Sequence, residues 1–192
     1  MRKLIALLAL PTLVACAPLA TEHRGDAAFR KALTAQLAHD EPRAELLYRE
    51  VLALGLDWSP VWNNLAVIQV HRHDYSAARK LLAHAVAANE RDVVALTNYG
   101  VISYHLSDYA EARRTLEEAR RLRTRLIESI PSMGRASWEE DQYARATQPL
   151  DETARRYLAR IDSATLSNEP PPPADLVADL RVTALRPLRA RF

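Results

Sequence analysis

The sequence has a single cysteine, Cys16, and only four glycines among its 192 residues. One cysteine cannot form a disulfide within the chain or supply the paired thiolates of a zinc site. Scarce glycine leaves no glycine-rich phosphate loop, and no HExxH or GxSxG motif is present. We therefore expect that the chain is not an enzyme, has no catalytic residues, binds no metal and needs no cofactor.

An excess of charge of either sign is also missing. The formal net charge is +2, and two basic residues, Arg2 and Lys3, lie in the N-terminal segment described below. The remaining chain carries 24 basic and 24 acidic side chains. Such a balance gives no electrostatic reason to expect nucleic acid as a partner. The abundant Ala, Leu, Arg and Glu favour helices, and we predict an all-α fold.

A 34-residue unit occurs twice in succession, in residues 59–92 and 93–126, with a weaker copy in residues 25–58. Apolar residues in each unit follow helical spacing in two stretches, which predicts a pair of helices. One pair cannot bury its own apolar faces, so the copies are expected to stack. Identical residues at matched positions are Asn64 and Asn98, Asp74 and Asp108, Ala78 and Ala112, Leu82 and Leu116, and Ala85 and Ala119.

The unit resembles the tetratricopeptide repeat (TPR), whose pattern is a large residue, Leu, Gly or Ala, and later Ala, a large residue and Ala. The final Pro of that pattern is replaced by Glu90 and Thr124. The resemblance implies a right-handed α-solenoid of about three helix hairpins, residues 25–58, 59–92 and 93–126. The matching residues are Trp62, Leu65, Ala66, Tyr75, Ala78, Leu82 and Ala85, followed by Leu96, Tyr99, Gly100, Tyr109, Ala112, Leu116 and Ala119.

In that family the first helix of each hairpin lines a concave groove that binds a segment of another protein. Asn64 and Asn98 would bond either the main chain of a ligand or the neighbouring helices. The Lys and Arg that clamp a terminal carboxylate in chaperone-binding members are absent here, so an apolar or amphipathic segment is expected. The groove positions carried over from the family are Phe29, Leu33, Asn63, Asn64, Val67, His71, Asn98, Val101, Tyr104 and His105.

The N-terminus has the layout of a secretory signal, with a basic start and an apolar stretch over residues 4–15. The sequence Leu13-Val14-Ala15-Cys16 resembles the bacterial lipobox. The resemblance implies a signal peptide over residues 1–15, lipidation of Cys16, a tether over residues 16–24, and sorting to the outer membrane, facing the periplasm. The alternative is an ordinary signal peptide cleaved near Ala17 or Ala20, with Cys16 incidental.

The C-terminal third is expected to cover the end of the stack. Residues 127–165 are predicted to form capping helices, interrupted at Pro149. Residues 166–192 contain four consecutive prolines and then a basic tail, which is disordered, docks back onto the helices or binds a partner. Six arginines between residues 113 and 125 form either a solvated face with i,i+4 pairs or a patch for an acidic partner or lipid headgroups.

Three functions fit these features. Short TPR lipoproteins resemble assembly factors of the tight-adherence pilus or of secretion systems, which predicts a membrane-anchored scaffold that binds protein partners of the cell envelope. A regulator of cell-wall enzymes is the alternative. An enzyme with an unrecognised site is the least favoured.

Overall fold

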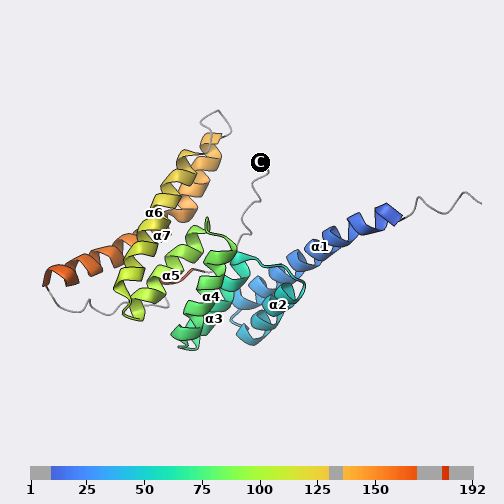
Figure 1. Ribbon diagram of the computed structural model, residues 1–192, viewed down its shortest axis with the longest axis horizontal. Helices are drawn as coiled ribbons and strands as arrows, with labels where there is room; N and C mark the ends of the chain where they lie inside the picture. The colour runs from blue at the N-terminus through green and yellow to red at the C-terminus, as the bar shows by residue number, and fades with distance from the viewer. Residues whose placement is uncertain (1–9, 130–135, 168–178, 182–192) are drawn as a thin grey trace, which may run out of the picture. The chain divides into compact units, whose positions relative to one another are not determined.

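The computed structural model describes residues 10–129, 136–167 and 179–181 (Figure 1). The described residues form seven α-helices and no strands, which confirms the all-α prediction. The chain divides into two compact units, Met1–Asp57 and Trp58–Phe192. The helices are α1 (Leu10–Leu37), α2 (Glu41–Ala53), α3 (Ser59–His71), α4 (Tyr75–Ala88), α5 (Val93–His105), α6 (Tyr109–Glu128) and α7 (Ala136–Ser167).

In the first unit, α1 and α2 pack against each other. The buried Tyr48 hydroxyl donates a hydrogen bond of 2.8 Å to Gln36 Oε1, and its ring lies 5.8 Å from that of Phe29. The sequence predicts that the first helix of this unit starts at Asp26, with that side chain as its cap, but α1 begins at Leu10, so this prediction is wrong. Residues 17–24 are helical rather than a separate tether. Two poor helix formers, Pro18 and Gly25, lie within α1, and they cost about 3 and about 1 kcal/mol relative to alanine.

The turns between paired helices recur every 34 residues. In each turn a residue with left-handed backbone precedes an aspartate that caps the next helix. The carboxylates of Asp40, Asp74 and Asp108 accept from the main-chain N–H groups of Arg43, Ala77 and Glu111. The preceding residues His39, His73 and Ser107 have φ values of 59°, 61° and 62°.

The sequence predicts helix N-caps at Asp74, Asp108 and Ser59. The two aspartates are confirmed as caps, whereas the prediction for Ser59 is wrong. The residue before α3 is Trp58, which makes no side-chain capping bond. The Ser59 hydroxyl instead donates to Asp92 Oδ2 over 2.7 Å, and Asp92 caps α5. Ser59 thus fixes the start of α3 to the start of α5, which is a packing role.

The core of the second unit contains a large apolar cluster from α3 to α7 and a smaller one that includes Leu96, Leu122 and Leu150. Small residues lie where helices meet: Ala66, Ala78 and Ala112 are fully buried. Gly100 of α5 faces Leu116 of α6 so closely that an added Cβ would lie 2.6 Å from Leu116 Cγ. Helix α7 closes this core with Ala154, Tyr157, Leu158 and Ile161.

Helix α7 is continuous through Pro149, so the predicted interruption into two helices is wrong. Figure 1 shows α7 changing direction along its length, which is the usual response to the missing N–H of a proline. Its contacts with α6 and α5 hold it together, and Leu150 beside the proline is buried. The predicted capping region, residues 127–165, includes residues 130–135, which lie outside the described ranges.

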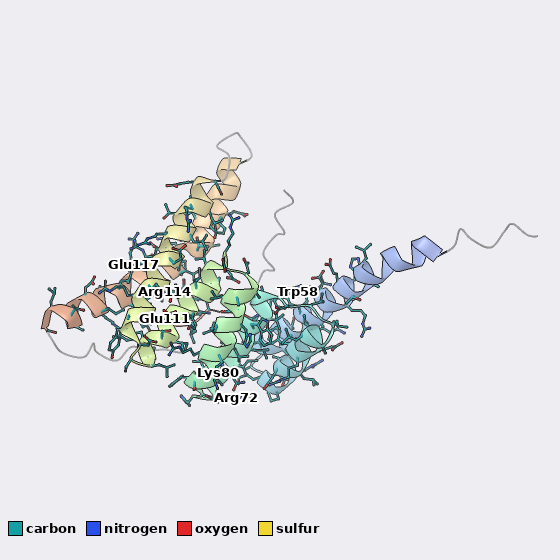
Figure 2. All side chains as sticks on the ribbon, in the orientation of Figure 1. Trp58, Arg72, Lys80, Glu111, Arg114 and Glu117 are labelled. Atoms are coloured by element: carbon teal, nitrogen blue, oxygen red, sulfur yellow. The ribbon has the colours of Figure 1, made fainter. Side chains whose placement is uncertain are left out.

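The arginines of α6 have two roles. Within α6, Arg114, Arg121 and Arg125 pair with Glu111, Glu117 and Glu118, as the prediction of a solvated face requires. Figure 2 labels Glu111, Arg114 and Glu117 along this helix. Across to α7, Arg113 pairs with Asp162 over 2.6 Å and Arg120 with Asp151 over 2.8 Å. Arg123 donates to Thr147 and to the Ala144 carbonyl. Half of the arginines therefore join α6 to α7.

Candidate functional site

Polar groups from three helices of the second unit converge on one short piece of the chain, Asp179–Arg181. Asn63 comes from α3, Asn98 from α5, and Arg156 and Tyr157 from α7. Figure 1 shows this piece as a short red segment beside α5. The contacts span 83 residues of sequence between Asn98 and Arg181, so only the folded unit can create the site.

Buried amides hold the main chain of the segment. The Asn98 carboxamide accepts from the Arg181 N–H over 3.2 Å and donates to the Arg181 carbonyl over 2.8 Å. Asn63 Nδ2 donates to the same carbonyl over 3.1 Å. Asn98 also donates to Asn63 Oδ1, and Asn63 donates to Asn64 Oδ1. All three asparagines are fully buried, so these bonds offset a desolvation cost of about 1–3 kcal/mol for each group left unpaired.

The carboxylate of Asp179 is bound from α7. Asp179 is only 4% exposed; it forms an ion pair with Arg156 and accepts from the Tyr157 hydroxyl over 2.9 Å. His105 Nε2 lies 3.1 Å from the Tyr157 hydroxyl oxygen. Because Tyr157 donates its only hydroxyl proton to Asp179, His105 is the donor in its hydrogen bond to Tyr157. Burial, and then the Asp179 charge, raise the pKa of Tyr157 well above its usual range.

The side chain between these polar contacts, Leu180, is buried in the apolar cluster of the unit. That cluster includes Val67 of α3 and Val101 and Tyr104 of α5. The Tyr104 and Tyr157 rings meet edge to face with their centroids 4.8 Å apart. The Arg181 side chain, in contrast, is exposed. The site therefore binds a carboxylate, then a leucine, then a main-chain N–H and C=O pair.

The predicted groove residues fall into three groups. Six of them are buried by the packing of the helices and by the 179–181 segment, and they do not line an open surface: Asn63, Asn64, Asn98, Val67, Val101 and Tyr104. His71 and His105 are partly exposed, at the ends of α3 and α5. Phe29 is buried and Leu33 partly buried on α1, in the other unit. For Cys16, only the backbone of α1 is described, and its side chain lies outside the described residues.

Sequence reasoning missed the residues that complete this site: Arg156, Tyr157, Asp179, Leu180 and Arg181. Docking of the tail was one of three open interpretations, and the structure shows it for residues 179–181. One sequence signal was available. Ala-Asp-Leu occurs twice in quick succession, at residues 174–176 and 178–180, which is unusual in a tail with no other pattern.

Apart from this site, a cavity of about 640 Å³ lies between α6 and α7 and is lined in part by Arg113, Arg120, Arg121 and Arg155. Each of these arginines is paired with a carboxylate, on Asp162, Asp151 or Glu117. Their charge is thus largely compensated. The described part of the chain contains no group of three or more His, Cys, Asp or Glu side chains placed to hold a metal ion.

Neither a protein-family model nor a curated protein matches the chain. None of the described helices is long and apolar enough to cross a membrane. Three features define the site. The amides of Asn63 and Asn98 bind the main chain of Arg181, Arg156 and Tyr157 bind the Asp179 carboxylate, and an apolar pocket between them holds Leu180. This arrangement holds a short segment of polypeptide.

Proposed function

We propose that the chain is a TPR protein that acts as a membrane-anchored scaffold in the bacterial envelope. The 34-residue spacing of the starts of α2, α4 and α6 supports the repeat assignment, since this is the period of the TPR. The recurring turn at Asp40, Asp74 and Asp108 supports it further. The proposal places three hairpins in a right-handed solenoid that is capped by α7.

The observation that best supports this function is that Asn98 and Asn63 form hydrogen bonds with the main chain of Arg181. Bonds to N–H and C=O recognise any polypeptide, and the pockets beside them select its side chains. In this proposal the site binds a segment of an envelope protein and assists assembly of a pilus or secretion apparatus. The lipobox-like residues 13–16 support a position at the outer membrane, facing the periplasm, as part of this proposal.

The proposal is tested in a strain that lacks the protein, complemented with the wild-type chain or with Asn98→Ala. We expect the strain to lose assembled pili or secretion, and Asn98→Ala to restore less than about a tenth of wild-type assembly, as expected for loss of an interaction worth about 1.4 kcal/mol or more. The exposed Gln148→Ala serves as the matched control and should restore it fully.

Affinity purification of the lipidated chain from membranes identifies the partner. An assembly component, recovered with Gln148→Ala but lost with Asn98→Ala, supports the scaffold. A cell-wall hydrolase or synthase recovered in its place, together with normal pili and secretion, would reject it in favour of the regulator.

A further inference from the structure

We propose that the site on α3, α5 and α7 is a receptor for a partner segment in which an acidic residue directly precedes leucine, and that Asp179–Arg181 occupies it as an internal competitor. This inference rests on the proposed function, because it names the ligand of the same site and how access to it is controlled.

The ligand chemistry follows from which groups of the segment are contacted. The Asp179 carboxylate meets Arg156 and Tyr157, and the Leu180 side chain enters the apolar cluster. At Arg181 the site contacts the main-chain N–H and C=O, while the side chain is exposed. The third position is therefore open to many residues, and the first two are selected.

The site requires an occupant. If the segment leaves, Asn98 loses both of its bonds to the Arg181 main chain, Asn63 loses one bond, and Tyr157 loses the Asp179 carboxylate. Losing hydrogen bonds at buried polar groups is costly, so an empty site is unfavourable. A partner segment of the same chemistry restores each bond, which makes exchange of one segment for another the favoured route of binding.

The internal segment also has features of a ligand rather than of an optimised core. It places a carboxylate in a buried position, where an apolar residue of similar size would avoid the desolvation of the charge. The Arg156 side chain that pairs with this carboxylate is itself 54% exposed, so it is reachable from solvent. Paired charges of this kind favour specificity over stability.

Covalent linkage makes the internal segment an effective competitor. Asp179 is connected to the end of α7 through residues 168–178 only, and short links give effective concentrations on the order of millimolar. The apparent Kd of a partner is the intrinsic Kd divided by the fraction of open sites. Displacing the internal segment should therefore tighten partner binding.

The test uses a fluorescent peptide, Ala-Asp-Leu-Arg flanked by Gly and Ser, and the full chain. Arg181→Pro removes the N–H that donates to Asn98 Oδ1, whereas Arg181→Ala changes only an exposed side chain. We expect Arg181→Pro to bind the peptide at least about tenfold more tightly than Arg181→Ala, which should match wild type. In the Arg181→Pro chain, Asn98→Ala and peptides with Leu→Ala or Asp→Asn should each weaken binding about tenfold or more.

A second measurement needs no substitution. Excess unlabelled peptide added to the wild-type chain should speed hydrogen exchange of the Arg181 N–H, while the Leu→Ala peptide should not.

If Arg181→Pro retains the wild-type helical circular dichroism but no chain binds the peptide, and exchange is unchanged, the segment is only part of the core and the inference is wrong. A wild-type dimer that Arg181→Pro dissociates would assign the site to a second copy of this chain and overturn the inference. Asn98-dependent recovery of the envelope partner alongside either result would leave the proposed function standing.

Discussion

At the scale of single residues, Gly100 sets how closely α5 approaches α6. A Cβ at this position would lie 2.6 Å from Leu116 Cγ and 2.8 Å from Leu116 Cδ2. We predict that Gly100→Ala lowers the free energy of unfolding by about 1–3 kcal/mol, the usual range for overpacking, despite the better helix propensity of alanine. Urea denaturation of the wild-type and Gly100→Ala chains measures this free energy of unfolding. In a double-mutant cycle, Leu116→Ala should remove part of the penalty; additive effects would contradict a clash between these two residues.

Tyr157 gives the site a predictable response to alkaline pH. Its pKa is raised by burial and by the charge of Asp179, with Arg156 and Arg160 opposing; His105 is its other polar neighbour. A raised pKa stabilises the fold below the unfolded value of about 10, and this contribution is lost as the pH rises from there toward the folded pKa. We predict that stability falls above pH 10 and that Tyr157→Phe reduces the fall.

Absorbance at 295 nm follows tyrosinate formation, and urea midpoints at pH 9 and pH 11 follow stability. Burial also raises the pKa of Tyr104 and Tyr143, so several tyrosines should ionise late in the wild-type chain, and Tyr157→Phe should show one late ionisation fewer. Ionisation of every tyrosine near pH 10 in the folded wild-type chain would contradict the assignment.

At the scale of helices, Asp108 both caps α6 and pairs with Arg79 of α4 over 2.6 Å. Both side chains of the ion pair are about one-third exposed, so the pair contributes little and the cap contributes more. We predict that Asp108→Ala destabilises the chain by about 1 kcal/mol. Asp108→Asn keeps the capping oxygen, so its loss should be less than half as large. Thermal denaturation compares the two, and equal losses would assign the effect to the ion pair.

The helices were predictable to the extent that they depend on local signals. The 34-residue period and the aspartates at positions 74 and 108 located α4 and α6. Two predictions failed where packing or continuity outweighed a local signal. Helix α7 continues through Pro149 because arginines of α6 bind Thr147 before the proline and Asp151 after it. Helix α1 starts before Asp26 although Pro18 lies inside it.

At the scale of the whole molecule, the site was predicted only in part. Asn98 was identified through its repeat position. Of the two alternatives, the structure shows its bond to the neighbouring helix, through Asn63 of α3, and it adds a bond to the main chain of Arg181 in the same chain. The occupant of the site could not be predicted, because residues 179–181 contact side chains of α3, α5 and α7 that come together only in the folded unit. Contacts between residues so distant in sequence depend on the assembled fold and leave little trace in local patterns.

The attachment of the molecule to a membrane is a separate prediction that depends on Cys16. A thioether-linked diacylglycerol with an N-acyl chain provides several acyl chains, and two or more anchor a protein stably. We predict that the wild-type chain stays in the membrane fraction after a wash in 1 M salt, which shortens the Debye length to about 3 Å and removes purely electrostatic binding. Cys16→Ser should be released, and intact-mass measurement should show the lipid on the wild-type chain alone.

Ala20→Ser is the matched control, since it alters the ordinary cleavage site and leaves the lipobox intact. Release of Ala20→Ser, or retention of Cys16→Ser after the wash, would contradict lipidation at Cys16.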